Sequence, residues 1–309
     1  MNRLVQGYLV LVTGALLLIV FSSYSNLESG KTSEENIAKA NTLSQVIESV
    51  RFDKDFDFAG EKLPMENFDT RERLETEILR NAYYHSSTLL NLKKTARFFP
   101  VIEPILKKNG VPDDFKYLAI AESNLSNPTS PAGAKGYWQF MRNTGLEYGL
   151  EINSEVDERM HIEKATEAAC RLIKKYKEQQ GSWTMAAAAY NMGSNGLNKE
   201  REAQKTDYYY DMNLNEETGK YIFRIMAFKE IMSSPQKYGF YLEEGDYYAP
   251  LDDYVIVETD TAIENLGDFA SKYGTSYRMI KVFNPWLLTN KLVNKAGKKY
   301  EIKVPRTKF

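Results

Sequence analysis

The segment Asp113–Asn124 reads DDFKYLAIAESN and predicts a short helix with one apolar face. Leu118 and Ala119 stand at helical spacing, and Glu122 continues their stripe at the C-terminal end of the helix. A carboxylate there loses solvent and meets the negative end of the helix dipole, so we expect its pKa to be raised. A carboxyl group that keeps its proton near neutral pH suits general-acid catalysis. The alternative is a glutamate that simply leaves the core at a frayed helix end.

The residues that follow this helix favour a ligand site beside Glu122. Ser126–Gly136 is rich in turn-forming residues, and its glycines let a ligand approach the backbone closely. Gln139, just after this loop, offers two donors and an acceptor to sugar hydroxyl or acetamido groups. Farther along, the small residues Ala186–Ala189 lead to Tyr190, which ends an apolar stretch with a polar group. Core packing and helix capping are the alternative explanation for each of these features.

Helical periodicity dominates the chain between residues 63 and 240, where no strand pattern is found. Pro100 and Pro104 are expected to break or bend the first of the helical segments. The expected helices, besides the one that contains Glu122, cover about 67–109, 162–179, 183–192 and 216–232. These patterns predict a mainly α fold.

After Pro250 the sequence changes to a short βααβ pattern. Strands are expected at Tyr254–Val257 and Tyr300–Val304, with helices at about 261–273 and 276–283 between them. Residues 251–309 are therefore expected to form a small second domain.

Composition excludes several classes of protein. The chain has 309 residues, with 40 Lys and Arg, 42 Asp and Glu and a net charge of -2, whereas a nucleic-acid-binding protein normally carries a basic excess. Cys170 is the single cysteine, so an internal disulfide and a cysteine zinc site are excluded. With only His85 and His161 and no glycine-rich phosphate loop, neither a metal nor a cofactor is expected. Asp53–Asp57 lacks the turn glycine of a calcium loop and is expected to be an exposed acidic stretch.

The N-terminus predicts export. Arg3 precedes the apolar run Leu4–Phe21, whose length lies between that of a signal-peptide core and that of a short spanning helix. The positive residue favours a cytoplasmic N-terminus with the rest of the chain on the other side. Residues 1–25 are therefore expected to be a signal peptide or an N-terminal membrane anchor, and residues 26–62 a linker. The alternative, a buried globular helix, fits poorly because the run lacks a polar face.

Several motifs within residues 65–240 follow one order, which resembles the catalytic domain of the soluble lytic transglycosylases, glycoside hydrolase family 23. The motifs are Ala121-Glu122-Ser123, Ala134–Met141 (AKGYWQFM), Thr144-Gly145, Tyr148–Leu150, Ala188–Gly193 (AAYNMG) and Glu217–Tyr221 (ETGKY). The resemblance implies a lysozyme-like helical catalytic domain over residues 63–240. It also implies a carbon–oxygen lyase that cuts the β-1,4 bond between N-acetylmuramic acid and N-acetylglucosamine in peptidoglycan without net addition of water.

The resemblance assigns roles to individual residues. Glu122 is expected to protonate the glycosidic oxygen and then to take the proton from the muramyl C6 hydroxyl, which closes a 1,6-anhydro ring. The acetamido group of the substrate replaces the second carboxylate that most glycosidases use. Tyr190 is expected to approach Glu122 or that acetamido group. Substrate binding is expected from Ser123, Gln139, Tyr190, Asn191, Tyr221 and Glu217, and Glu217 is the most plausible second carboxylate. Glu147, Glu151 and Asp157 are weaker candidates for that carboxylate and are expected to be solvated surface groups.

The C-terminal unit resembles a LysM domain, a module that holds glycans containing N-acetylglucosamine. The residues that carry this resemblance include Leu266, Phe269, Tyr273, Ile280, Asn284 and the closing strand 302–305. Thr259 replaces the usual glycine, and the stretch Trp286–Lys299 is long. The alternative is a small domain that only packs on the catalytic one.

Together, the export signal and the resemblance imply an enzyme on the periplasmic side of the cell envelope, membrane-anchored or exported. Its expected partners are peptidoglycan strands and, through the N-terminal segment, the membrane, with no nucleic acid. Two other functions stay open. One is a hydrolytic muramidase on the same fold, which needs a second carboxylate to position water opposite Glu122. The other is an inactive scaffold that binds peptidoglycan.

Overall fold

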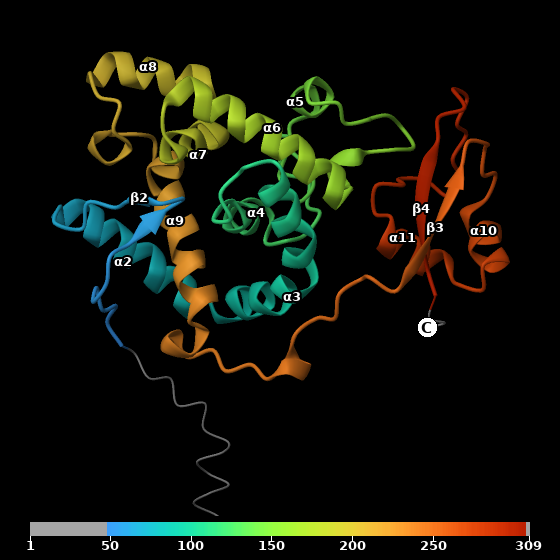
Figure 1. Cartoon of the computed structure of the whole chain (residues 1–309), viewed down its shortest axis with the longest axis horizontal. Helices are drawn as coiled ribbons and strands as arrows, with labels where there is room; N and C mark the ends of the chain where they lie inside the picture. The colour runs from blue at the N-terminus through green and yellow to red at the C-terminus, as the bar shows by residue number, and fades with distance from the viewer. Residues whose placement is uncertain (1–47, 307–309) are drawn as a thin grey trace, which may run out of the picture. The chain divides into compact units, whose positions relative to one another are not determined.

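The computed structural model describes residues 48–306, and the residues from Ser49 onward belong to one compact unit (Figure 1). The predicted signal peptide or anchor over residues 1–25 and most of the predicted linker lie outside the described residues. No helix within residues 48–306 is long and apolar enough to cross a membrane.

The first and larger part of this unit is built from helices, which confirms the mainly α prediction. A short antiparallel hairpin precedes them, in which β1 (Asp57–Phe58) pairs with β2 (Glu61–Lys62). The helices are α2 (Phe68–Tyr83), α3 (His85–Lys108), α4 (Phe115–Ser123), α5 (Arg142–Glu147), α6 (Ile162–Gln180), α7 (Trp183–Met192), α8 (Ser194–Gln204) and α9 (Glu216–Ser233). The hairpin, α5 and α8 have no counterpart among the predicted elements.

Capping residues explain where several helices begin and end. At the start of α2, the side chain of Asn67 accepts a hydrogen bond from the backbone N–H of Asp69 at 3.0 Å. Gly181 ends α6 in the left-handed region, with φ 85°. The next residue, Ser182, then caps α7 by accepting a hydrogen bond from Met185 N at 3.1 Å. Because these signals are local, the observed bounds of α7 coincide with the predicted ones.

The helical segment predicted over residues 67–109 is interrupted at Tyr84 and not at its prolines. At Tyr84 ψ is 60°, outside the helical region, and the chain turns there from α2 into α3. Of the expected break or bend at Pro100 and Pro104, the break does not occur, since α3 continues through both residues. The two prolines stand four residues apart, so the missing donor of Pro104 is the one that would bond to the carbonyl of Pro100. The two missing backbone hydrogen bonds therefore lie on the same face of the helix.

The core is organised around α4, which packs against α3 and α9 (Figure 1). Phe115, Leu118, Ala119 and Ile120 of α4 are completely buried. Burying a large apolar side chain of this kind contributes about 1.5–3 kcal/mol, so the position of α4 is strongly fixed. The packing of α4 on α9 brings together two helices that lie far apart in the sequence.

The C-terminal part is the predicted βααβ unit. It consists of β3 (Tyr254–Thr259), α10 (Leu266–Lys272), α11 (Tyr277–Phe283) and β4 (Tyr300–Pro305). The two strands pair antiparallel, from Tyr254 opposite Pro305 to Thr259 opposite Tyr300. α10 begins later than the predicted residue 261 because Asn265 caps it by accepting a hydrogen bond from Gly267 N at 2.6 Å.

Candidate active site

Glu122 lies in the last turn of α4, where the apolar stripe of the helix ends. Leu118 and Ala119 are completely buried on this stripe, as their spacing predicts, and Glu122 is partly buried. The helix ends at Asn124, which has φ 51° and donates its N–H to the carbonyl of Ile120 at 2.8 Å. This cap fixes the end of α4 and with it the position of the carboxylate.

The environment of Glu122 raises the pKa of its carboxyl group. Burial raises this pKa to about 7, and the negative charge of Glu217 acts in the same direction. The hydroxyl of Tyr221 donates a hydrogen bond to Glu122 Oε1, and this bond limits the rise together with the positive charge of Arg224. Near neutral pH the group is divided between its protonated and ionised forms, which suits a residue that gives and takes a proton.

Tyr221, on α9, is buried, with 2% of its surface exposed. Burial raises the pKa of its hydroxyl well above the usual value, and the charge of Glu122 adds to the effect. Tyr221 is therefore a neutral hydrogen-bond donor to the carboxylate at physiological pH.

Asn191, at the end of α7, connects that helix to the first turn of α9. Its side-chain N–H donates to Glu217 Oε1 at 3.2 Å. Its Oδ1 accepts a hydrogen bond from the hydroxyl of Thr218 at 2.7 Å. Both contacts hold α7 and α9 together beside Glu122, and they give the carboxylate of Glu217 a defined partner.

Tyr190 precedes Asn191 and donates its hydroxyl to the carbonyl of Trp138 at 2.7 Å. Burial raises the pKa of Tyr190 well above its usual value, and the nearby charge of Glu122 raises it further. Tyr190 thus lies in the electrostatic environment of Glu122, but its hydrogen bond goes to the backbone of the loop that contains Gln139.

Gln139 and Ser123 make hydrogen bonds within their own segments. Gln139 has φ 47°, and its Nε2 donates to the carbonyls of Gly136 at 2.8 Å and Pro128 at 3.2 Å. The hydroxyl of Ser123 donates to the carbonyl of Ala119 at 2.9 Å, one turn back in α4. The structure therefore gathers Tyr190, Asn191, Glu217 and Tyr221 around Glu122, and the roles of all seven predicted residues stay predictions.

Arg224 is a charged neighbour of Glu122 that the sequence motifs do not include. It stands three residues after Tyr221 on α9, a spacing that places both side chains on one helix face. Its Nε lies 3.4 Å from Glu77 Oε2, and Arg80 Nη1 lies 2.9 Å from Glu77 Oε1. These three residues line a pocket of about 410 Å³ with Asn81, Tyr83 and Tyr84. Glu122 itself does not line this pocket.

The expectation that Asp157 is a solvated surface carboxylate is wrong. Asp157 is 2% exposed, and its two carboxylate oxygens accept hydrogen bonds from Nε and Nη2 of Arg159 at 2.9 and 2.8 Å. Nη1 of Arg159 then donates to the carbonyls of Gly133 and Phe140, each at 3.0 Å. Because Asp157 and Arg159 neutralise each other and Arg159 also bonds to two carbonyls, this ion pair tolerates burial. Glu147 is exposed, as expected.

No group of three or more His, Cys, Asp or Glu side chains within residues 48–306 is arranged to hold a metal ion. Cys170 is buried in α6, and burial raises the pKa of its thiol to about 12. Its thiol therefore packs as a small apolar group.

The raised pKa of Glu122 predicts a pH-dependent cost to folding. The folded protein binds the proton of the Glu122 carboxyl group more tightly than the unfolded chain does. The stability that this protonation contributes is therefore fully present below about pH 4.5 and is lost as pH rises through about 7. Glu122→Gln, which stays neutral, is expected to raise the free energy of unfolding by roughly 2–3 kcal/mol at about pH 8. It should change stability little at about pH 4. Denaturant unfolding at both pH values measures this difference, and an equal effect at both would contradict it.

Comparison with known proteins bears on the same residues. Residues 99–213 match the transglycosylase SLT domain, a range that includes Glu122, Gln139 and Tyr190 and ends before Glu217. Residues 255–308 match the soluble lytic transglycosylase C-terminal LysM-like domain. Both resemblances found from sequence motifs are thereby confirmed.

Two curated relatives carry the name membrane-bound lytic murein transglycosylase D, one from Escherichia coli strain K12 and one from Escherichia coli O6:H1. Each is 28% identical to this chain over 237 residues, which cover 74% of the chain and 50% of the relative. The chain spans about half the length of the curated relatives it matches.

Proposed function

The chain carries a transglycosylase SLT domain followed by a LysM-like domain, and from this premise we propose that it is a peptidoglycan lytic transglycosylase. Its substrate is the β-1,4 bond between N-acetylmuramic acid and N-acetylglucosamine. The single observation that carries the proposal is the partly buried carboxyl group of Glu122, which accepts a hydrogen bond from Tyr221 and whose pKa is raised to about 7.

In the first step, protonated Glu122 gives its proton to the glycosidic oxygen, and the bond from that oxygen to the muramyl C1 breaks. N-acetylglucosamine leaves with a free hydroxyl group. The positive charge that develops at C1 is stabilised by the acetamido group of the substrate. Tyr221 donates a hydrogen bond to the carboxylate that this step creates, and so offsets the cost of a buried negative charge.

In the second step, the ionised Glu122 takes the proton from the muramyl C6 hydroxyl. The C6 oxygen forms a bond to C1, which closes the 1,6-anhydro ring and returns Glu122 to its protonated form. No water enters the product. One residue therefore serves as acid and then as base, and a pKa near the working pH favours both transfers.

The runner-up function is hydrolysis by a muramidase that uses a second carboxylate to position water. Glu217 is a carboxylate whose charge raises the pKa of Glu122, but it already accepts a hydrogen bond from Asn191. Mass spectrometry of fragments released from purified sacculi separates the two reactions. Anhydro ends support transglycosylation, and reducing ends support hydrolysis.

The pH dependence of cleavage follows from the pKa of Glu122. Since the first step needs the protonated form, kcat/KM should fall as pH rises through about 7. The hydrogen bond from Tyr221 lowers the pKa of Glu122, so Tyr221→Phe is expected to move this fall to higher pH. A pH profile of both proteins on glycan strands measures the shift. A profile that moves to lower pH would contradict the assigned contact.

We place the enzyme in the cell envelope on the periplasmic side, exported or anchored by residues 1–25. The apolar run Leu4–Phe21 supports this location, as does the name of the membrane-bound relatives. Residues 63–240 are proposed as the catalytic domain and residues 251–309 as the LysM-like domain. The linker predicted over residues 26–62 extends too far, because Phe58 is completely buried in the helical core and β2 ends only at Lys62. Peptidoglycan strands and the membrane are the proposed partners.

A further inference from the structure

Residues 151–163, which we name the docking segment, pair with the backbone of the LysM-like part. Val156 forms an antiparallel bridge with Leu287. Asp157 N donates to the carbonyl of Trp286 at 2.9 Å, and Leu288 N donates to the carbonyl of Glu155 at 2.7 Å. Val156 is completely buried and belongs to the apolar core of the LysM-like part. The docking segment thus completes that core, although it lies in the middle of the predicted catalytic domain.

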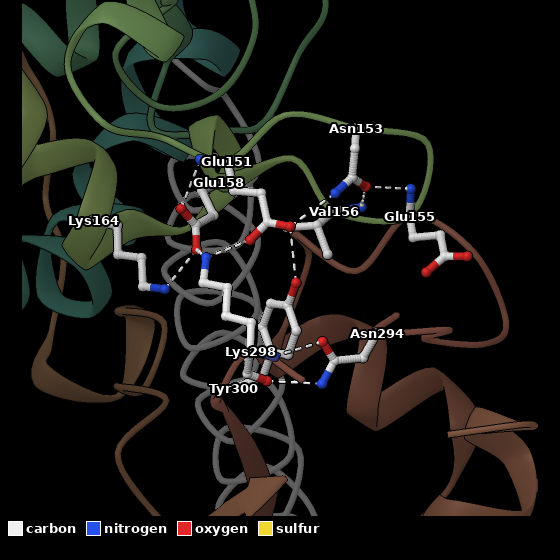
Figure 2. Close-up of polar contacts among 9 residues, drawn as sticks. All are labelled: Glu151, Asn153, Glu155, Val156, Glu158, Lys164, Asn294, Lys298 and Tyr300. Atoms are coloured by element: carbon white, nitrogen blue, oxygen red, sulfur yellow. Dashed lines mark hydrogen bonds and ion pairs between the residues drawn. The ribbon is translucent and has the colours of Figure 1, made fainter. Parts of the chain in front are cut away.

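Side chains extend the same contact (Figure 2). The hydroxyl of Tyr300 donates to Glu151 Oε1 at 2.8 Å. Lys298 pairs with Glu151, and its Nζ also lies 3.5 Å from Glu158 Oε1. The opposite oxygen of Glu158, Oε2, accepts the backbone N–H of Glu151 at 2.8 Å. In Figure 2 these carboxylates and Lys298 converge on one network between the two parts.

An aromatic stack lies beside this network. The rings of His161 and Trp286 are stacked with centroids 5.6 Å apart, and those of Trp286 and Tyr300 with centroids 5.9 Å apart. Trp286 is 3% exposed, so these contacts lie in the interior of the protein. Each aromatic pair of this kind contributes about 0.5–1.5 kcal/mol beyond its buried area.

The other side of the docking segment supports the loop formed by residues 128–140. Arg159 bonds to the carbonyls of two of its residues, as described above, and Lys135 Nζ lies 3.4 Å from Asp157 Oδ2. The approach is closest at Gly136, where a Cβ would lie only 1.9 Å from the carbonyl oxygen of Arg159. The same loop carries Gln139 and accepts the hydrogen bond from Tyr190. It therefore lies between the docking segment and the residues gathered around Glu122.

We propose that the LysM-like part is a positioning platform for the 128–140 loop, acting through the docking segment. Asp157 links the two sides, because its backbone N–H bonds to Trp286 while its carboxylate orients Arg159. Arg159 is accordingly a positioning residue. The backbone edge at residues 286–288 is occupied by the docking segment and is not free for another strand. The effect on catalysis rests on the proposed function, whereas the effect on the loop does not.

The test is Trp286→Ala in the full chain, followed by amide hydrogen exchange. Loop amides are informative because Lys135 N bonds to Phe140 O at 3.1 Å and Gln139 N bonds to Gly136 O at 3.2 Å. We expect exchange in residues 133–141 to quicken about tenfold, with α4 and α9 unchanged. On glycan strands kcat should fall about tenfold, with KM within about twofold, because a displaced loop misorients bound substrate.

The matched control is Tyr273→Ala, which removes a half-exposed aromatic ring from the same part, packed on Phe269. It should leave exchange in residues 133–141 as in the wild type. Loop exchange unchanged in Trp286→Ala, or quickened equally in Tyr273→Ala, would overturn the proposal. The same criterion applies if Trp286→Ala unfolds β3 and β4, because the docking segment then loses its partner and exchange in the 128–140 loop should still quicken. If the wild type does not cleave glycan, the exchange result still decides the proposal, and only the proposed function fails.

Discussion

Glu122→Gln is expected to lower the rate of glycan cleavage by about 10³-fold or more. The amide has the shape of the carboxyl group and can still accept the hydrogen bond from Tyr221, so the fold and the cap at Asn124 should persist. It can neither give a proton to the glycosidic oxygen nor take one from the C6 hydroxyl. Because both steps need the same group, the loss falls on both. Turnover of purified sacculi, followed as soluble fragments, measures the effect.

Two further variants serve as controls for the loss of cleavage rate in Glu122→Gln. Glu178→Gln changes an exposed carboxylate on α6 and should keep wild-type activity. Glu217→Gln removes the charge that adds to the raised pKa of Glu122, and its rate should stay within about tenfold of wild type. A loss in Glu217→Gln as large as in Glu122→Gln would favour the two-carboxylate hydrolase. Retained activity in Glu122→Gln would remove the basis of the mechanism.

Gly136→Ala is expected to lower the free energy of unfolding by about 3 kcal/mol or more. Gly136 has φ 87°, where any other residue is strained, and its Cβ would lie 1.9 Å from the carbonyl oxygen of Arg159. Relief requires the 128–140 loop to move away from the docking segment. Cleavage should therefore fall with stability, because Gln139 and the carbonyl that receives the Tyr190 hydroxyl lie in the same loop. Denaturant unfolding and turnover of one preparation measure both effects.

Gly133→Ala is the matched control for that variant. Gly133 has φ 86°, almost the same backbone strain, but a Cβ there meets nothing within 4 Å. It should cost only the strain of about 1–2 kcal/mol. Equal destabilisation by the two variants would mean that backbone strain alone, and not contact with Arg159, explains the glycine at position 136.

Elements with local signals could be predicted from the sequence. Examples are the apolar stripe of α4, the serine cap of α7 and the alternating strands of the βααβ unit. Each of these signals is contained in a few consecutive residues. α8 could not be predicted, because only Leu197 is buried in a helix that otherwise reads as polar. The break at Tyr84 also lacks a signal, since no proline or glycine marks it, whereas the two prolines inside α3 gave a misleading one.

The electrostatic environment of Glu122 could be predicted in part from the sequence, but its contacts could not. The position of Glu122 at the end of an apolar stripe indicated a raised pKa before any partner was known. The hydrogen bond from Tyr221 joins residues on two helices that no local pattern relates. For Asp157 the sequence predicts a surface position, because charged side chains are usually exposed. The contacts that bury this carboxylate join distant segments, since Arg159 bonds to the carbonyls of Gly133 and Phe140 and Asp157 N bonds to that of Trp286.

The central claim is that Glu122 drives cleavage in which no water is consumed. The most direct measurement is cleavage of sacculi in ¹⁸O-labelled water, followed by mass spectrometry of the released muropeptides. The account predicts anhydromuramyl ends that carry no heavy oxygen in the wild type and no product from Glu122→Gln. Reducing muramyl ends that contain one heavy oxygen atom would contradict it.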